Sequence, residues 1–457
     1  MSDPTAKVGD VALTRLRRGE VVGYAMGSVG TGAFSTVPGL LLAYYLTDTL
    51  GVAAGLAALV VAVPKLWDVL ILPIVGSVSD KAMLRVGSRR PFLLLGGLLL
   101  PVCFVAMFAV PEGLSPGLSA AWVLVAFTAA ATAFAIFQVP YIAMPAEITD
   151  DVEERTTLMS WRVAFLSIAI LLAGAGAPLI RDTVGGSAGY LAMAAAIALL
   201  IAVGMLGCWW AMRTTRSWQR ADETTGLRES LRVAVHHRPF VVLLGAFVLQ
   251  ALATSSMLGA AQYVATYRLG DPGAITVLFL GLVAPAILVM PLWTRVSHVW
   301  GKRTGFTAAS VVFLVGTVAI LGADALSSLA LVTLAVAVCG VGYAGMQMFP
   351  LSMLPDTIAA DTAASGQRRS GVFTGLWTAG ETAGFALGPA LVLLVLSLGG
   401  FVSSQADEQV AQPASAETAI LLAFTLVPAA LLVLSLPLVR AYRLPEIPAS
   451  SDLEVVS

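Results

Sequence analysis

Charged residues are scarce in this chain of 457 residues, since Asp, Glu, Lys and Arg together make up only 12% of it. Soluble domains carry about 25% charged residues, so this chain has too few to cover a hydrated surface. Its formal net charge of −1 gives no strongly basic surface of the kind that binds nucleic acid. Instead, 58% of the residues are hydrophobic and the mean hydropathy is +0.89, values typical of a chain that lies in a lipid bilayer.

Cysteine is nearly absent as well. Cys103, Cys208 and Cys339 each stand alone in an apolar stretch, without the spacing of a metal site or a redox pair. Residues 1–20 contain no short apolar core followed by a small-residue cleavage site, so we expect no cleaved signal peptide. The sequence also lacks a nucleophile elbow and a phosphate-binding loop. We therefore expect neither an enzyme nor a protein that holds a metal or a cofactor.

Twelve hydrophobic stretches are long enough to cross a bilayer, which takes about 20 mostly apolar residues. They lie at 20–46, 54–79, 91–110, 118–145, 157–180, 189–212, 239–265, 273–297, 304–323, 327–352, 370–397 and 417–439. The expected division is a tail 1–19, a six-helix bundle 20–212, a linker 213–238, a six-helix bundle 239–440 and a tail 441–457. The predicted fold class is an all-α membrane protein with twelve transmembrane helices in two bundles.

The basic residues are distributed unequally among the loops. Alternate loops on the side of the two chain ends hold 22 of the 26 Lys and Arg residues, whereas the opposite side holds only Arg181 and Arg268. Short loops rich in Lys and Arg stay in the cytoplasm. We therefore expect a multi-pass protein of the inner membrane with both termini in the cytoplasm. A monomer is expected, with the lipid bilayer as its surroundings.

The two halves of the chain resemble each other. Pro140-Tyr-Ile-Ala-Met-Pro145 recurs 210 residues later as Pro350-Leu-Ser-Met-Leu-Pro355, and each copy is followed by an acidic residue. A basic turn that begins at Gly87 recurs at Gly301. Such echoes indicate parallel six-helix repeats, an arrangement that places a binding site between the halves near the membrane midplane.

Several motifs resemble those of a known family. The loop from Gly76 to Pro91 resembles the loop between spans two and three of the major facilitator superfamily. The other motifs are Tyr44-Tyr45-Leu46-Thr47-Asp48, Lys65-Leu66-Trp67-Asp68 with Pro73, Pro140-Tyr141, Leu354-Pro355-Asp356 and Gly375-Leu376-Trp377. Together they resemble the glycoside-pentoside-hexuronide:cation symporter family over most of Tyr24 to Gly400. The resemblance implies symport of a small organic solute, a sugar or glycoside, with a proton or sodium ion by alternating access.

Certain positions depart from the family pattern. Carboxylates in spans one and four bind the sugar in that family, and here Gly32 and Gln138 stand at the matching positions. Two carboxylates in span two hold the sodium ion; Asp68 matches the first, while Leu72 replaces the second. The family has a lysine in span eleven, and here Thr382 replaces it, with Glu381 beside it. These replacements keep an alternative open, namely proton-driven export of drugs or amphipathic molecules, or lysolipid transport.

Four charged residues stand out because they fall inside expected spans, away from the terminal positions, where a charge costs roughly 2.5–3.5 kcal/mol or more. Lys65 and Asp68 are three residues apart and can pair on one helix face, as a coupling switch or as a permanent structural ion pair. Glu381 lies among small residues and is either a proton carrier or a packed hydrogen-bonding side chain. Arg162 is either a gate residue at the cytoplasmic mouth or a side chain that reaches out to water. The cation-coupling candidates are Lys65, Asp68 and Glu381.

Other polar and aromatic side chains can offer a sugar hydrogen bonds and flat apolar faces, although Trp and Tyr also mark the headgroup region. The candidate substrate-binding residues are Tyr24, Gln138, Tyr141, Arg162, Trp377 and Thr382. Acidic residues and basic turns on the cytoplasmic side either latch the two halves together or form solvated loops. The candidate gating residues are Asp80, Arg89, Arg90, Glu147, Arg303 and Asp356.

Overall fold

The first half of the chain forms a bundle of long helices in the computed structural model, which describes residues 16–86, 88–149, 152–213, 236–325, 328–365, 370–405 and 410–443. The elements of this half are α1 (Arg18–Val37), the π-helical turn η1 (Pro38–Leu42), α2 (Ala43–Asp48), α3 (Ala54–Val86), α4 (Arg90–Phe108), α5 (Pro116–Ile148), α6 (Val152–Val184) and α7 (Gly186–Met212). The first three run on from one another as one span, Arg18–Asp48.

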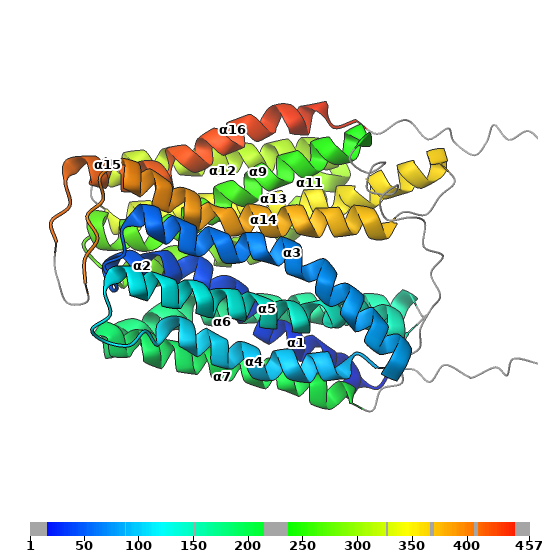
Figure 1. The fold of residues 1–457 in the computed structure, drawn as a ribbon. Helices are drawn as coiled ribbons and strands as arrows, with labels where there is room; N and C mark the ends of the chain where they lie inside the picture. Colours follow the sequence, from blue (N-terminus) through cyan, green and yellow to red (C-terminus); the bar gives the residue numbers. More distant parts are fainter. Residues whose placement is uncertain are drawn as a thin grey trace, which may run out of the picture.

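The second half repeats this plan. Its elements are α9 (Arg238–Tyr263), the π-helical turn η2 (Val264–Arg268), α10 (Ala274–Leu288), α11 (Met290–Trp300), α12 (Lys302–Ala325), α13 (Leu329–Ser365), α14 (Ser370–Leu398), α15 (Ala414–Phe424) and α16 (Leu426–Ala441). In each half a π-helical turn therefore follows the first α-helix. Figure 1 shows the two halves side by side, with the first half below the second and the long helices aligned along roughly the same axis.

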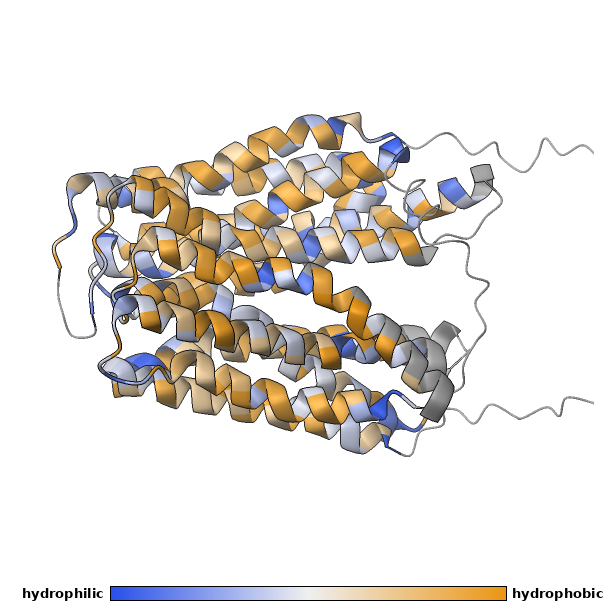
Figure 2. Cartoon of the chain, viewed as in Figure 1, coloured by the Kyte–Doolittle hydropathy of each residue, from blue (hydrophilic) through white to orange (hydrophobic). Residues whose placement is uncertain are grey.

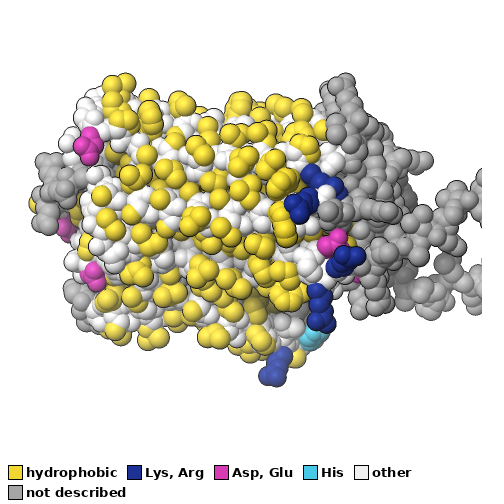
Figure 3. Space-filling view, turned by 90° about the horizontal axis from the view of Figure 1, so that it is seen from below, with side chains coloured by type: hydrophobic (Ala, Val, Ile, Leu, Met, Phe, Trp, Pro, Cys, Tyr) yellow, Lys and Arg dark blue, Asp and Glu magenta, His cyan; other side chains and the backbone are white. Residues whose placement is uncertain are grey.

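The two ends of the bundle differ in charge. α1 and α9 begin, and α7 and α16 end, on the right in Figure 1. We call this the basic end, because it carries Arg89, Arg90, Arg213, Arg238, Arg295, Lys302, Arg303, Arg440 and Arg443. Figure 3 shows an apolar band across one face of the molecule, with Lys and Arg side chains gathered at one edge and most of the visible Asp and Glu side chains at the other. The helix ends thus carry the charge asymmetry that the loops predict.

Large apolar side chains cover the outside of the helices along their middle. Val102, Val125 and Leu288, for example, are 68%, 70% and 77% exposed. Figure 2 shows that hydrophobic residues dominate this middle zone and that hydrophilic residues lie mainly near the two ends. So much exposed apolar surface fits a hydrocarbon environment. Among the described residues, eleven helical segments are long and apolar enough to cross a membrane, and the bent pair α10 and α11 raises the number to twelve. The predicted fold class is therefore confirmed.

The structure departs from the predicted spans at two places. The expected span 273–297 is two helices, α10 and α11, which meet at an angle of 49°. Pro285 and Pro291 flank this bend, and each removes a backbone donor from the helix. In contrast, α13 continues through Pro350 and Pro355 to Ser365, well past the predicted end at residue 352. The helix therefore accommodates both prolines.

Small residues allow the helices to pack closely. A Cβ atom on Gly204 of α7 would lie 2.7 Å from the backbone nitrogen of Gly30 in α1 and 2.8 Å from the carbonyl oxygen of Met26. A Cβ atom on Gly342 of α13 would lie 2.5 Å from the backbone nitrogen of Phe313 in α12. Glycine is needed at these crossings because helices in a membrane associate through close backbone contact.

The halves meet along a few helices. α3 packs along α14, α6 against α10, and η1 against α9. These interface helices include those that carry Asp68 (α3), Arg162 (α6) and Glu381 (α14). Lys65 lies on α3 as well, so the fold places all four intramembrane charged candidates on helices at the junction of the two halves.

Candidate functional site

Lys65 and Asp68 form an ion pair on α3. The Lys65 Nζ atom lies 3.7 Å from Asp68 Oδ2, as the spacing of the two residues predicts. The ammonium group also lies 5.8 Å from the ring centre of Phe34 and 5.4 Å from that of Phe127, distances at which aromatic rings attract a cation. Asp68 is only 5% exposed, and its buried Oδ1 atom has no hydrogen-bond partner. The carboxylate is therefore only half satisfied, which leaves one oxygen able to accept a proton or a cation.

Tyr24, Tyr141 and Arg162 come together from three helices of the first half. The rings of Tyr24 (α1) and Tyr141 (α5) stack with their centres 4.7 Å apart, and the Tyr141 hydroxyl donates to the Tyr24 carbonyl at 2.9 Å. Ser28 also shares a hydrogen bond of 2.8 Å with that hydroxyl. Both tyrosines are 0% exposed, so their faces lie in the protein core rather than on an open cavity. Arg162 packs against this pair, because its guanidinium carbon lies 5.6 Å from the Tyr141 ring centre.

Across the interface, Glu381 of α14 faces this group. The carboxylate of Glu381 interacts electrostatically with the guanidinium of Arg162 and with Tyr343 of α13. Tyr343 in turn accepts a hydrogen bond of 3.0 Å from Gln347. A carboxylate of the second half and a guanidinium of the first half therefore lie near enough to interact across the junction. Thr382 follows Glu381 on the same helix and is partly buried.

Some of the buried polar atoms without partners lie on α3, α6 and α14 at the junction and on the neighbouring α5. Besides Asp68 Oδ1, they include Gln138 Oε1 on α5, Arg162 Nε on α6 and Trp377 Nε1 on α14. The Trp377 ring itself is held in place by stacking on Phe247, with ring centres 4.6 Å apart. A buried polar group without a partner costs roughly 1–3 kcal/mol, so such groups mark places where a partner is expected to bind.

At the basic end, the charged residues of the second half pair within that half. Asp356 of α13 binds Lys302 of α12, with 2.5 Å between the Lys302 Nζ atom and Oδ2. Lys302 also donates to the Ser352 carbonyl at 2.9 Å. Arg303, one of the predicted gating residues, is exposed. Its neighbour Lys302 makes the contact with Asp356 instead. The Asp356 pair thus joins two helices of one half.

The same holds for the first half as far as it is described. Arg90 donates to the carbonyl of Arg213 at 2.6 Å, which ties α4 to the end of α7. Arg89 precedes α4 and is partly buried. The side chains of Asp80 and Glu147 lie outside the described part of the structure. The predicted latch between the halves at this end therefore stays a prediction.

The opposite end joins the two halves through residues to which the sequence analysis gave no role. Tyr267 of η2 donates a hydrogen bond to Asp48 at the end of α2. A hydrogen bond of 2.7 Å connects the hydroxyls of Thr47 and Tyr263, and Thr47 also donates to Asp48 at 2.5 Å. All four residues lie near the ends of the first spans of the two halves, Arg18–Asp48 and Arg238–Arg268. The internal repeat pairs these two spans, and that was the signal in the sequence that could have revealed the contact.

Further contacts reinforce this junction. Arg181 of α6 donates to Gln262 of α9 at 2.9 Å, and Leu50 forms an isolated antiparallel bridge with Gln405. The backbone nitrogen of Ser404 donates to the Thr47 carbonyl at 2.9 Å. We call this set of contacts between the halves the opposite-end closure. The described contacts between polar groups of the two halves therefore concentrate at the end away from the basic end.

Two helical halves, charged groups on the helices between them and a closure at one end define a multi-pass membrane transporter of the major facilitator type. The solved structure of a bacterial homologue of the iron transporter ferroportin in an inward-facing state has the same fold. Its TM-score to this chain is 0.64 at 15% sequence identity, with 94% of this chain and 99% of that one covered.

The chain belongs to the MFS/sugar transport protein family, which it matches over residues 23–446. It is 26% identical over 439 residues to the uncharacterized symporter YnaJ of Bacillus subtilis, covering 93% of this chain and 92% of the relative. It is also 26% identical over 397 residues to a glucuronide carrier protein homolog of Escherichia coli, covering 84% of each. The resemblance to the glycoside-pentoside-hexuronide:cation symporters is thereby confirmed, and the family is one of transporters.

Proposed function

We propose that this protein imports a sugar or glycoside together with a proton by alternating access, as a monomer in the inner membrane. The observation that carries the proposal is the half-satisfied ion pair of Lys65 and Asp68, buried on a helix at the junction of the halves. A charge in this position is costly, so a group that binds and releases a cation accounts for its presence. The relatives named as a symporter and as a glucuronide carrier protein homolog support cation-coupled transport of a sugar or glycoside.

The ion pair favours a proton over sodium as the coupling ion. The Lys65 ammonium already occupies one side of the Asp68 carboxylate, and Leu72 stands one turn further along α3 where a second carboxylate would be needed. A sodium ion would therefore find one free oxygen beside a fixed positive charge. Protonation of Asp68 instead removes its charge and releases Lys65, which changes the electrostatic balance between the two halves.

The unpartnered buried atoms favour a polar solute. Arg162 Nε and Trp377 Nε1 are donors, whereas Gln138 Oε1 is an acceptor, and a sugar hydroxyl serves either role. An amphipathic molecule would leave most of these atoms unsatisfied. In this assignment Arg162, Trp377 and Gln138 contact the solute, Thr382 lies nearby, and Tyr24 and Tyr141 hold Arg162 in place.

The positions of the charges support an assignment of which end of the molecule faces the cytoplasm and which faces outward. Basic helix ends stay in the cytoplasm, so the basic end faces inward and the opposite-end closure faces outward. The described contacts then correspond to a state closed toward the outside. Release of the solute to the cytoplasm would occur from this state, and breakage of the opposite-end closure would reopen the site to the outside.

A screen followed by transport tests this proposal. Purified protein is heated with hexoses, pentoses, β-glycosides and glucuronides, and compounds that raise its melting temperature are tested for uptake into proteoliposomes. We expect accumulation under an imposed proton gradient at constant sodium concentration, and none under a sodium gradient at constant pH. Accumulation driven only by sodium would contradict the choice of ion, and uptake that no gradient drives above equilibrium would contradict symport.

A further inference from the structure

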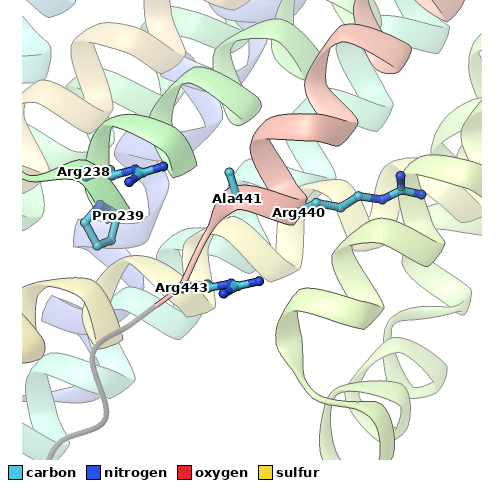
Figure 4. A pocket seen from close by; sticks show the side chains of 5 residues that line it. All are labelled: Arg238, Pro239, Arg440, Ala441 and Arg443. Atoms are coloured by element: carbon cyan, nitrogen blue, oxygen red, sulfur yellow. The ribbon is translucent and has the colours of Figure 1, made fainter.

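A hollow lined by arginines lies at the basic end of the second half, away from the junction of the halves. Arg238, Pro239, Arg440, Ala441 and Arg443 surround a cavity of about 390 Å³. Arg238 is the first residue of α9, Ala441 is the last of α16, and Arg443 follows two residues later. The hollow therefore lies between the start of α9 and the end of α16, the first and last helices of this half, as Figure 4 shows.

The hollow is strongly positive. Within the described part of the chain, none of these three arginines has a carboxylate or hydrogen-bond partner. α9 also begins here without a side-chain cap, so the positive end of its dipole adds to the field. Orientation in the membrane requires basic residues on this side but does not require them to share one cavity.

Lipid-facing surface continues directly from the hollow. On α9, Val241 is 43% exposed only three residues after Arg238. On α16, Val433 and Leu434 are 51% and 61% exposed about two turns before the end of the helix. A molecule with a phosphate in the hollow would therefore have apolar protein surface alongside it, at the depth of acyl chains.

We propose that this hollow binds the phosphodiester headgroup of an anionic phospholipid from the leaflet at the basic end. Basic pockets between transmembrane helices recognise such headgroups through charge-assisted hydrogen bonds. In Figure 4, Arg238 extends toward the end of α16, whereas the guanidinium of Arg440 extends away from Arg238. Arg238 and Arg443 therefore hold the phosphate, and the lipid bridges α9 and α16. The proposal is independent of which solute the protein transports.

Native mass spectrometry of the full-length protein in detergent tests this site. The probe is palmitoyl-oleoyl phosphatidylglycerol, with the zwitterionic phosphatidylcholine of the same chains as reference. The double variant Arg238→Gln/Arg443→Gln should weaken binding of the first phosphatidylglycerol by about tenfold or more, because each basic residue near the surface contributes about 1 kcal/mol. Arg295→Gln/Arg303→Gln removes two exposed charges from the same end. Because exposed charges are screened by salt, this control should change phosphatidylglycerol binding by less than about twofold.

Two further measurements keep the test decisive. Ala441→Phe fills the hollow without removing a charge, so it should also weaken phosphatidylglycerol binding even if the double variant fails to fold. Inorganic phosphate and glycerol 3-phosphate should not raise the melting temperature of the wild-type protein, since they lack acyl chains. Equal losses in both double variants, unchanged binding in Ala441→Phe, or equal stabilisation by the soluble phosphates would each overturn the proposal.

Discussion

Tyr267 of η2 donates a hydrogen bond to the carboxylate of Asp48 at the end of α2, although 219 positions separate the two residues in the chain. The contact joins the last turn of the first span in each half. Thr47 and Tyr263 make a second hydrogen bond beside it, 2.7 Å long. The two halves are thus locked at this end by equivalent segments of the internal repeat, which gives the closure an approximate symmetry.

Removal of this hydrogen bond should open the closed end more often. Tyr267→Phe deletes only the hydroxyl, and a hydrogen bond to a charged group is worth about 1.5–3 kcal/mol. We therefore expect the ratio of open to closed molecules to rise about tenfold or more. Double electron–electron resonance between spin labels at Ser187 and Thr418, exposed positions in the two halves, should show an added population at longer distance.

Tyr45→Phe is the matched control for this variant. The Tyr45 hydroxyl donates to the Phe108 carbonyl at 3.1 Å, a contact within the first half. Its loss should lower stability slightly and leave the distance distribution unchanged. The same broadening in both variants would show that the Asp48 contact has no special part in the closure.

Close helix packing can be tested at Gly204. Gly204→Ala places a methyl group against the backbone of α1, which should cost about 1–3 kcal/mol and lower the melting temperature in detergent. Gly176→Ala, in α6, meets no atom within 4 Å and should leave the melting temperature unchanged or raise it slightly. A Gly204→Ala protein as stable as the wild type would contradict the crossing of α1 and α7 described here.

The Trp377 indole should contribute to solute binding through its unpartnered N–H. Trp377→Phe keeps the stack on Phe247 but removes that donor, so KM should rise about 2- to 12-fold, the equivalent of one hydrogen bond. In Trp293→Phe the lost donor is already bound to the Val341 carbonyl at 2.8 Å. That variant should lose stability without a change in KM. The reverse pattern, with KM altered only by Trp293→Phe, would remove Trp377 from the site.

Glu381 should contribute to the pH dependence of transport beside Asp68. Glu381→Gln fixes this side chain in a neutral form, so uptake should fall less steeply as the pH rises, and the remaining fall should reflect the loss of the proton from Asp68. Initial uptake rates between about pH 5 and 9 measure this change. Glu112→Gln, in the exposed turn between α4 and α5, should keep the wild-type profile. A profile that is identical in all three proteins would assign Glu381 to packing.

Local patterns carried most of what the sequence could predict. The spans follow from runs of apolar residues, and the Lys65 and Asp68 pair follows from their spacing on one helix, a geometry that is the same in any α-helix. The bend between α10 and α11 was missed because prolines are tolerated in some helices, such as α13, and break others. Local sequence does not reveal which outcome the neighbouring helices permit.

Contacts between distant segments could not be predicted in this way. Tyr24 and Tyr141 were both named as substrate-binding residues, yet nothing in the sequence showed that their rings stack in the core. The link between Arg162 and Glu381 depends on how the two halves face each other. The repeat indicated a binding site between the halves, but it did not identify Asp48 or Tyr267.

The central claim is that Asp68 couples the proton to the solute, and Asp68→Asn tests it most directly. In proteoliposomes with a glycoside or glucuronide identified by the melting-temperature screen, this variant should lose accumulation driven by a proton gradient. It should keep exchange of labelled for unlabelled solute, which needs no net proton movement. Asp271→Asn, in an exposed turn at the opposite end, should retain both activities. Gradient-driven accumulation at the wild-type level in Asp68→Asn would contradict the account.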